Sequence, residues 1–297
     1  MLVIARYALK SPFHASTMVG VLAILSLFIP LVSVLSGAIV GLIILTQGLF
    51  SGARAILVSI IGISIVSYFA MQSAELGLTI GLIQWLPMMV LAEILRRSHS
   101  ISFTVIAGML LAMLAVLAQY LLWPESEQVL QALLQQMLQG FEQSSAEQGQ
   151  QLQQLLQSML HWTVILMVAV MYSTFIATLM AARWFQAKLA GVEGFQDEFY
   201  SIRLGKVAAG AGAALFVLNA LLQQDWLLSL LMVYMAAFLY QGLAVLHSWN
   251  TARKGKTITW LFLLYAMMMI IPQVAGLVAL LGVADNWMNF RAKLKAL

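Results

Sequence analysis

Residues 124–160, PESEQVLQALLQQMLQGFEQSSAEQGQQLQQLLQSML, form a long polar stretch in an otherwise apolar chain. The stretch is rich in glutamine and contains neither lysine nor arginine. Long apolar segments lie on both sides of it, about five before and four after. A polar insert of 37 residues between membrane-crossing segments must lie on one side of the bilayer. We expect the outer side, because cytoplasmic loops are the ones enriched in Lys and Arg.

The composition of the chain defines its structural class. Of 297 residues, 62% are hydrophobic and 9% are charged, and the mean hydropathy is +0.94. Soluble domains carry about 25% charged residues, so a soluble fold of this size is excluded. Apolar runs of about 18 residues or more recur, each long enough to cross the hydrocarbon core as a helix. The sequence predicts an all-α, polytopic helical membrane protein in contact with the lipid bilayer.

Hydropathy predicts about eight to nine transmembrane helices. A single helix over residues 15–49 would be about 52 Å long, too long for one crossing, and Pro30 can break it. Two short spans fit this region, and so does one span with a re-entrant segment. The predicted spans are 15–29, 31–49, 54–71, 77–95, 101–122, 161–182, 204–222, 227–248 and 258–283.

The distribution of basic residues predicts the orientation. A cytoplasmic N-terminus places most of them inside, as expected for a multi-pass protein of a bacterial inner membrane. These residues are Arg6, Lys10, Arg54, Arg96, Arg97, Arg183, Lys188, Arg203, Lys206, Arg253, Lys254 and Lys256. The last three, Arg291, Lys293 and Lys295, lie in a tail that nine spans would place outside. A re-entrant segment near Pro30 or Pro272 would make the number of crossings even and place the tail inside.

The glutamine-rich stretch predicts a periplasmic amphipathic helical hairpin. Apolar residues follow helical spacing over 129–141 and again over 152–160. Ser144 and Glu147 have the spacing of a capping box that starts the second helix. The predicted organisation is an N-terminal bundle (1–123), the hairpin (124–160), and a C-terminal bundle (161–297) with a cytoplasmic interfacial helix at 194–203.

Small residues repeat at spacings that allow close helix packing. Glycines at 37, 41, 48 and 52 share one face of the predicted second span, and another pair opens the fourth. Packing within the chain is the default interpretation, and a docking face for another membrane subunit is the alternative. The helix-packing candidates are Gly37, Gly41, Gly48, Gly52, Gly77 and Gly81.

Polar residues inside spans are candidates for a ligand site, because they are costly there. Gln84 lies mid-span beside Trp85 and Pro87, and a proline can kink the helix so that it lines a site. Together with residues at predicted outer ends, these side chains could line a cavity that opens outward. The alternative is simple bonding between helices. The candidate ligand-binding residues are Gln72, Glu75, Gln84, Trp85, Asn219 and Asp225.

Several function classes lack support. The chain has no cysteine, so disulfides and Cys-ligated metals are excluded. Its four histidines are scattered, and neither a nucleotide-binding nor a catalytic motif occurs. The net charge of +4 comes from short clusters between spans and does not indicate nucleic-acid binding. We therefore expect no enzyme activity, no catalytic residue, no metal and no cofactor.

The long cytoplasmic segment Arg183–Lys206 is the candidate for contacting a protein partner. Phe195, Phe199 and Ile202 make an apolar face at helical spacing, with charged residues around it. This pattern is typical of a short helix lying at the inner interface. The candidate partner-contact residues are Phe195, Glu198, Phe199 and Arg203.

Three motifs carry a resemblance to a known family. They are Gly194-Phe195-x-x-Glu198-Phe199-x-x-x-Arg203, then Gln241-Gly242-Leu243-Ala244, then Asp285-x-Trp287-x-x-Phe290-Arg291. The chain resembles an uncharacterised bacterial family of multi-pass membrane proteins, the domain of unknown function numbered 2232. That family looks related to substrate-binding components of energy-coupling-factor vitamin transporters and, more distantly, to a cell-shape protein of the rod complex. Those transporter subunits typically have six spans and no long periplasmic insert.

Two functions follow as hypotheses. The first is a transport-type subunit that binds a small molecule in an outward-facing cavity and draws energy from a partner or an ion gradient. The second is a non-enzymatic membrane scaffold or assembly factor that acts through protein–protein contacts.

Overall fold

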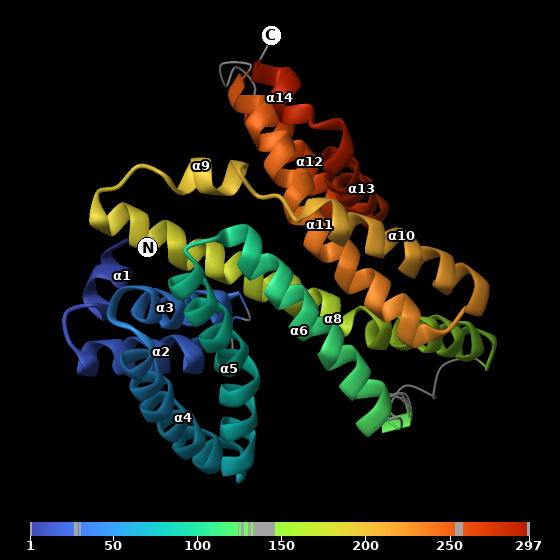
Figure 1. The fold of residues 1–297 in the computed structure, drawn as a ribbon. Coiled ribbons are helices and arrows are strands. Elements are labelled where there is room, and N and C mark those ends of the chain that lie inside the picture. Colours follow the sequence, from blue (N-terminus) through green and yellow to red (C-terminus); the bar gives the residue numbers. More distant parts are fainter. Residues whose placement is uncertain are drawn as a thin grey trace. The chain divides into compact units, whose positions relative to one another are not determined.

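The computed structural model describes residues 2–26, 29, 31–123, 125, 128–129, 132, 146–252 and 258–295. Every regular element in these residues is a helix, which confirms the predicted all-α class. The helices, labelled in Figure 1, are α1 (Leu2–Ala8), α2 (Pro12–Ser26), α3 (Val32–Gln47), α4 (Leu49–Met71), α5 (Ala74–Ser98), α6 (Ile101–Leu122), α8 (Ala146–Ala190), α9 (Phe195–Tyr200), α10 (Gly205–Leu222), α11 (Asp225–Ala252), α12 (Ile258–Ile270), α13 (Pro272–Met288) and α14 (Phe290–Lys295).

Six helices of the described residues are long and apolar enough to cross a membrane, and the bent pair α12–α13 would make a seventh. The six are α4, α5, α6, α8 from Leu155 onward, α10 and α11. The predicted number was higher because hydropathy also selects α2 and α3. These have 15 and 16 residues, or about 22–24 Å, less than the roughly 30 Å of hydrocarbon.

The predicted periplasmic hairpin lies only partly within the described residues. Residues 133–145, including Ser144 of the predicted capping box, are outside them. The second predicted helix is the beginning of α8, which runs without interruption from Ala146 to Ala190. The predicted span 161–182 is therefore the continuation of that helix and not a separate one.

The chain divides into two compact units that are interleaved in sequence. Unit 1 comprises Met1–Gly108 and Ser173–Arg203, and unit 2 comprises Met109–Tyr172 and Leu204–Leu297. In unit 1, α2 and α3 run antiparallel, because Ser36 Oγ donates to the Val19 carbonyl (3.1 Å) and Gln47 Nε2 donates to the Leu9 carbonyl (3.4 Å). Helices α4 and α5 pack along each other and meet in the turn at residues 72–73.

Five of the six predicted packing glycines, all in unit 1, lie at close helix contacts. Added Cβ atoms on Gly37 and Gly41 would lie 2.9 Å from Thr178 Cγ2 and 2.9 Å from Ala182 Cβ, both on α8. Those on Gly77 and Gly81 would approach Ser64 and Ile60 of α4, and that on Gly52 would approach Ile44.

Gly48 is the exception, because it separates α3 from α4 instead of continuing a helix face. Its φ of 92° lies in a region that L side chains rarely adopt. Gly52 therefore belongs to α4 and does not share a helix with Gly37 and Gly41.

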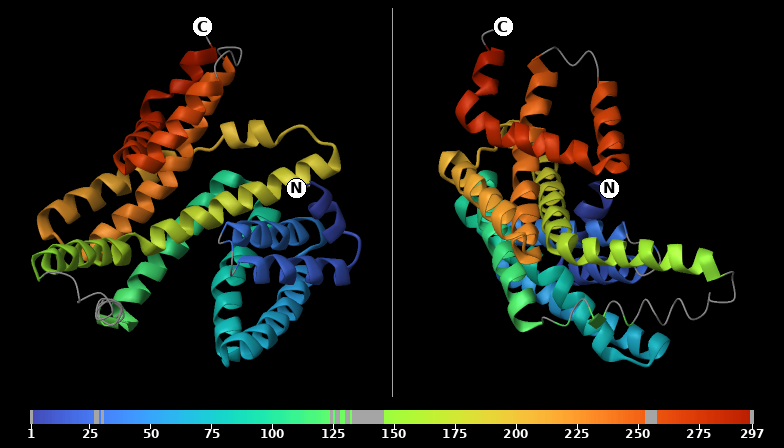
Figure 2. Two further views of the ribbon diagram at one scale, coloured as in Figure 1. Left: turned by 180° about the vertical axis from the view of Figure 1, so that it is seen from behind. Right: turned by 90° about the vertical axis from the view of Figure 1, so that its right-hand side faces the viewer.

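Unit 2 is built on the long helix α11. It packs antiparallel to α10, where Tyr234 Oη donates to the Ala209 carbonyl (3.1 Å), and it also packs against α13. Close approach to α13 depends on Gly242 and Gly282, whose added Cβ atoms would lie 1.9 Å from the Val278 carbonyl oxygen and 2.2 Å from the Phe238 carbonyl oxygen. Between α12 and α13 the chain bends by 118° at Ile271–Pro272, a change of direction visible in Figure 2.

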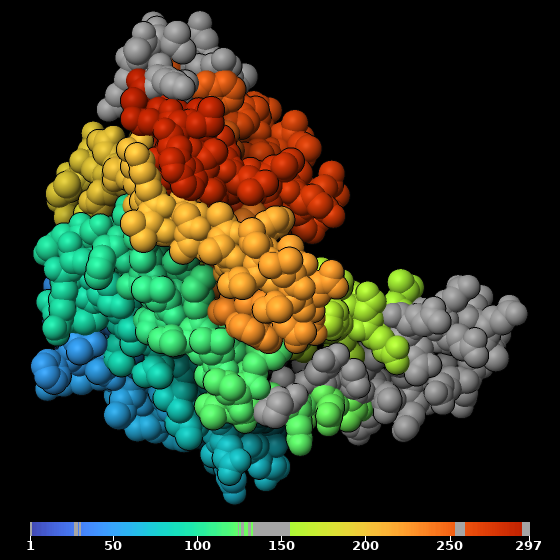
Figure 3. Space-filling view, turned by 45° about the vertical axis from the view of Figure 1, so that its right-hand side comes forward, coloured from blue at the N-terminus to red at the C-terminus, as the bar shows by residue number. Residues whose placement is uncertain are grey.

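Helix α10 exposes most of its apolar side chains. Ala209 and Gly212 are its buried residues, whereas Val207, Phe216 and Leu221 are among the exposed ones. Figure 3 shows α10 (light orange) at the surface. Few residues of unit 2 pack against the apolar surface of α10, as expected for a helix that faces lipid.

Candidate functional site

The structure places Gln84 and Trp85 at the contact between α5 and α3. Gln84 Nε2 donates to the Ser33 carbonyl (2.9 Å), and Trp85 Nε1 donates to Ser36 Oγ (3.2 Å). The Trp85 side chain is fully buried. Helix α5 continues through Pro87 from Ala74 to Ser98. The side-chain donors of this predicted ligand pair are thus used in bonds between helices.

Of the other candidate ligand residues, Gln72 and Glu75 lie in the same unit as this pair and do not join it. Gln72 ends α4 in the left-handed conformation, and Glu75 lies in the first turn of α5, where a carboxylate is favoured. Both are exposed, and Glu75 lies about 14 Å from Gln84 along the helix axis. Asn219 and Asp225 belong to unit 2.

Within unit 2, polar side chains of three helices form what we call the α6–α8–α11 cluster: Tyr120, His161, Asp225 and Ser229, which make two contacts, and Gln119, which precedes Tyr120 on α6. The Tyr120 hydroxyl lies 3.2 Å from Ser229 Oγ, and His161 Nε2 lies 3.7 Å from Asp225 Oδ1. Asp225 and Ser229 are one turn apart on α11, so they share a face of that helix. The cluster therefore joins the end of α6, the first half of α8 and the beginning of α11.

Gln119 distinguishes this cluster from an ordinary interhelical contact. Its Nε2 atom is buried and has no hydrogen-bond partner within the described part of the chain. Leaving such a donor unpaired costs about 1–3 kcal/mol, so a bound water or ligand is the usual explanation. Asp225 was predicted as a ligand residue from the sequence, and the other four residues were not. A usable signal was present, since each lies near a predicted outer end of a span.

A second polar group, which we call the C-terminal network, lies where α13 ends: Gln241, Asp285, Asn286 and Arg291. Asp285 is fully buried. Its carboxylate accepts hydrogen bonds from Arg291 Nη2 (2.7 Å), Gln241 Nε2 (3.2 Å) and the Phe290 backbone N–H (3.1 Å). The charge of this buried carboxylate is compensated by the guanidinium and by the further donors. Removing one member of the ion pair would leave an uncompensated buried charge and destabilise the fold.

The C-terminal network also binds the beginning of α10. Gln241 Oε1 accepts a hydrogen bond from the Leu204 backbone N–H (2.9 Å), and Asn286 Oδ1 accepts one from the Gly205 backbone N–H (3.0 Å). The end of α13 and the first residues of α10 are thus held together through side-chain amides. Gln241, Asp285 and Arg291 belong to the sequence motifs that carry the family resemblance, although sequence analysis gave them no role.

The predicted partner-contact residues lie on and beside α9. Arg183 of α8 binds both carboxylate oxygens of Glu198, at 2.9 Å from Nε to Oε2 and by a second bond from Nη2. Phe195 and Phe199 are half-buried and stacked, with ring centroids 6.5 Å apart. The Arg203 side chain has an exposed position. A bidentate ion pair therefore fixes α9 to α8.

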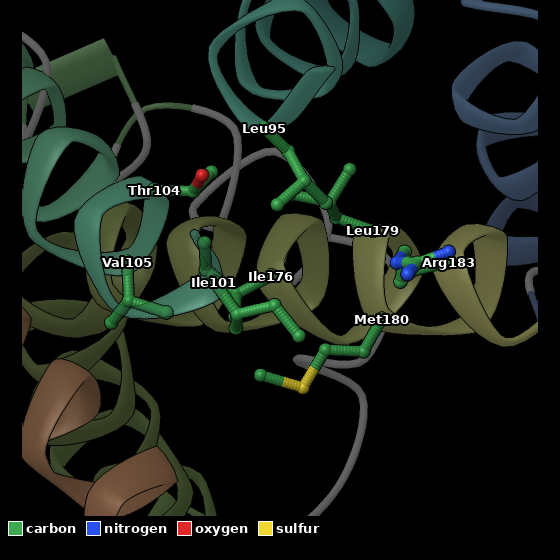
Figure 4. Close-up of a pocket in the computed structure, with 8 residues that line it drawn as sticks. All are labelled: Leu95, Ile101, Thr104, Val105, Ile176, Leu179, Met180 and Arg183. Carbon is green, nitrogen blue, oxygen red and sulfur yellow. The ribbon is translucent and has the colours of Figure 1, made fainter. Parts of the chain in front are cut away.

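A small apolar pocket lies in unit 1 near Arg183 (Figure 4). Its volume is about 10 Å³, enough for roughly one water molecule. It is too small for an organic ligand. The residues that line it are Leu95, Ile101, Thr104, Val105, Ile176, Leu179, Met180 and Arg183.

Comparison with known proteins identifies a family. Neither a curated protein nor a solved structure matches the chain. A family model described as "Predicted membrane protein (DUF2232)" matches residues 17–286, which is most of the sequence. The match agrees with the apolar helices of both units. The chain is an integral membrane protein and belongs to the DUF2232 family of predicted membrane proteins.

Proposed function

We propose that this protein is a transport-type subunit of a bacterial inner membrane and binds a small polar molecule at the α6–α8–α11 cluster. The observation that carries the proposal is the buried Gln119 Nε2 atom, which has no partner in the described residues and directly precedes Tyr120, a member of a group of hydroxyl, imidazole and carboxylate side chains. Buried polar groups in membrane helices typically belong to substrate or ion pathways.

The orientation of the cluster follows from the distribution of charge. With the N-terminus in the cytoplasm, the segments next to Gln119, His161 and Asp225 contain no Lys or Arg and lie outside. Asp225 is about half exposed, with 47% of its side chain accessible. The cluster is thereby reachable from the outer side.

The chemistry of the cluster defines the ligand class. The Gln119 amide offers a donor for a carbonyl or carboxylate oxygen, and the Tyr120 and Ser229 hydroxyls can donate or accept. The Asp225 carboxylate accepts from an N–H or a cationic group. A small solute that carries both kinds of group fits. The subunit is non-enzymatic, and a partner or an ion gradient supplies energy, as the resemblance to energy-coupling-factor substrate-binding components implies by analogy.

Ligand-induced stabilisation tests this proposal. The purified protein is heated in detergent with pooled polar metabolites of bacterial cells, and its unfolding temperature is measured. A ligand present at 100 times its Kd stabilises the folded state by about 2.7 kcal/mol. Wild type should respond to at least one pool and Gln119→Leu should not. The control Gln224→Leu changes an exposed glutamine of the α10–α11 turn and should respond as wild type does. Equal responses of wild type and Gln119→Leu would contradict the assignment.

A scaffold or assembly factor is the second candidate, favoured by the way in which α9 is fixed. Because Arg183 holds Glu198, the Phe195–Phe199 pair and Arg203 are presented in a defined arrangement, as a protein partner would require. Deletion of residues 126–158 and the substitution Phe199→Ala should each reduce recovery of a partner while the protein still inserts into the membrane. Unchanged recovery in both variants would exclude these contact regions.

A further inference from the structure

We infer that α12 and α13 form a re-entrant hairpin, which enters the membrane and returns to the cytoplasmic side without crossing. The predicted span over 258–283 is not one straight helix, because the chain bends by 118° at Ile271–Pro272. Helix α12 has 13 residues, or about 20 Å, so it ends before a complete crossing of roughly 30 Å. Pro272 starts the next helix at a position where its missing N–H is not needed.

The C-terminal network determines the side to which α13 returns. The end of α13 bonds to the first residues of α10, through Asn286 to Gly205 and through Asp285 and Gln241 to Leu204. The two helix ends therefore lie at the same depth. Helix α10 follows the segment Arg183–Lys206, whose basic residues place it in the cytoplasm.

The α10–α11 hairpin shows how far the end of α13 lies from the outer side of the membrane. Helix α10 has 18 residues, about 27 Å, between Gly205 and its outer turn at Gln223–Gln224. Helix α11 returns antiparallel to the cytoplasmic side, as the Tyr234–Ala209 bond shows. Because α12 begins on the side where α11 ends, both ends of the α12–α13 pair lie on the cytoplasmic side.

The distribution of basic residues also agrees with a cytoplasmic end of α13, whereas nine spans would place the basic tail outside. With a re-entrant α12–α13, the tail that carries Arg291, Lys293 and Lys295 is cytoplasmic, and all 15 Lys and Arg residues lie inside. The antiparallel pair α2–α3 does not change whether the number of membrane crossings is even or odd. The chain begins and ends this pair at the same depth, because Gln47 at the end of α3 contacts Leu9, just before α2. The six long helices then alternate across the membrane and leave both ends of the chain on one side.

Cysteine labelling tests this topology directly, because the natural chain has no cysteine and each variant reports one position. Single cysteines replace Ala292 in α14, Ile270 at the hairpin tip, Gln224 at the outer turn and Glu193 in the cytoplasmic segment. All four positions are exposed in their own unit. A membrane-impermeant maleimide is applied to right-side-out and to inside-out vesicles.

Ala292→Cys should react as the control Glu193→Cys does, in inside-out vesicles, and opposite to Gln224→Cys. Ile270→Cys should stay unreacted in right-side-out vesicles and react after detergent is added. Reaction of Ala292→Cys in right-side-out vesicles would show a complete crossing and overturn the inference. Neither variant changes a residue of the α6–α8–α11 cluster. The labelling result and the ligand-stabilisation result are therefore independent, and either proposal can be refuted while the other stands.

Discussion

The contact between α11 and α13 makes a quantitative prediction for Gly282→Ala. The added Cβ would lie 2.2 Å from the Phe238 carbonyl oxygen and 2.7 Å from the Gly242 backbone nitrogen. Both neighbours are backbone atoms, so a side-chain rotation cannot relieve the overlap. The helices must separate, and overpacking of this kind typically costs about 1–3 kcal/mol.

Gly276→Ala is the matched control on the same helix. A Cβ at this position meets no atom within 4 Å. Alanine is favoured over glycine in a helix interior by about 0.8–1.0 kcal/mol, so this variant should be neutral or stabilising. Thermal unfolding of the two variants in one detergent compares them directly. Gly282→Ala should unfold at a clearly lower temperature than wild type, and equal stability of the two variants would refute the close contact.

Three further predictions concern the polar contacts. Asp285→Ala removes the buried carboxylate that binds Arg291 and should destabilise the protein by about 3–5 kcal/mol, whereas adding Arg291→Leu should restore part of the loss, measured by thermal unfolding. Gln84→Leu removes one interhelical hydrogen bond, which is worth about 0.6 kcal/mol in membrane proteins. This variant should keep the ligand response. Loss of the response would indicate that the ligand binds at Gln84 and Trp85, the pair predicted from the sequence. Arg183→Gln should accelerate amide hydrogen exchange in α9, while Lys188→Gln on the exposed face of α8 should not; equal exchange would contradict the tethering of α9.

The class of the fold could be predicted from sequence because it depends on composition and on the length of apolar segments. Both are local properties, and α4, α5, α6, α10 and α11 follow the predicted spans within a few residues. The bend at Pro272 was harder to predict. A hydropathy window averages over it, and Pro87 in a similar apolar setting leaves its helix continuous.

The polar contacts could not be predicted because their members are distant in sequence. Gln241 and Asp285 are 44 positions apart, and Tyr120 and Ser229 are 109 positions apart. Helical spacing places residues on a face of one helix but does not determine which helix lies opposite. The interpretation of Gly48 as a packing residue failed for a related reason: the sequence shows a glycine but not the backbone angle that requires it.

Native mass spectrometry of the protein, extracted gently from its own membrane, tests the proposed small-molecule binding most directly. The proposal predicts a stoichiometric polar molecule on the wild-type protein and on Gln224→Leu, and its loss from Gln119→Leu. A stoichiometric protein partner without any small molecule on the wild type would contradict the transport-type function and would favour the scaffold.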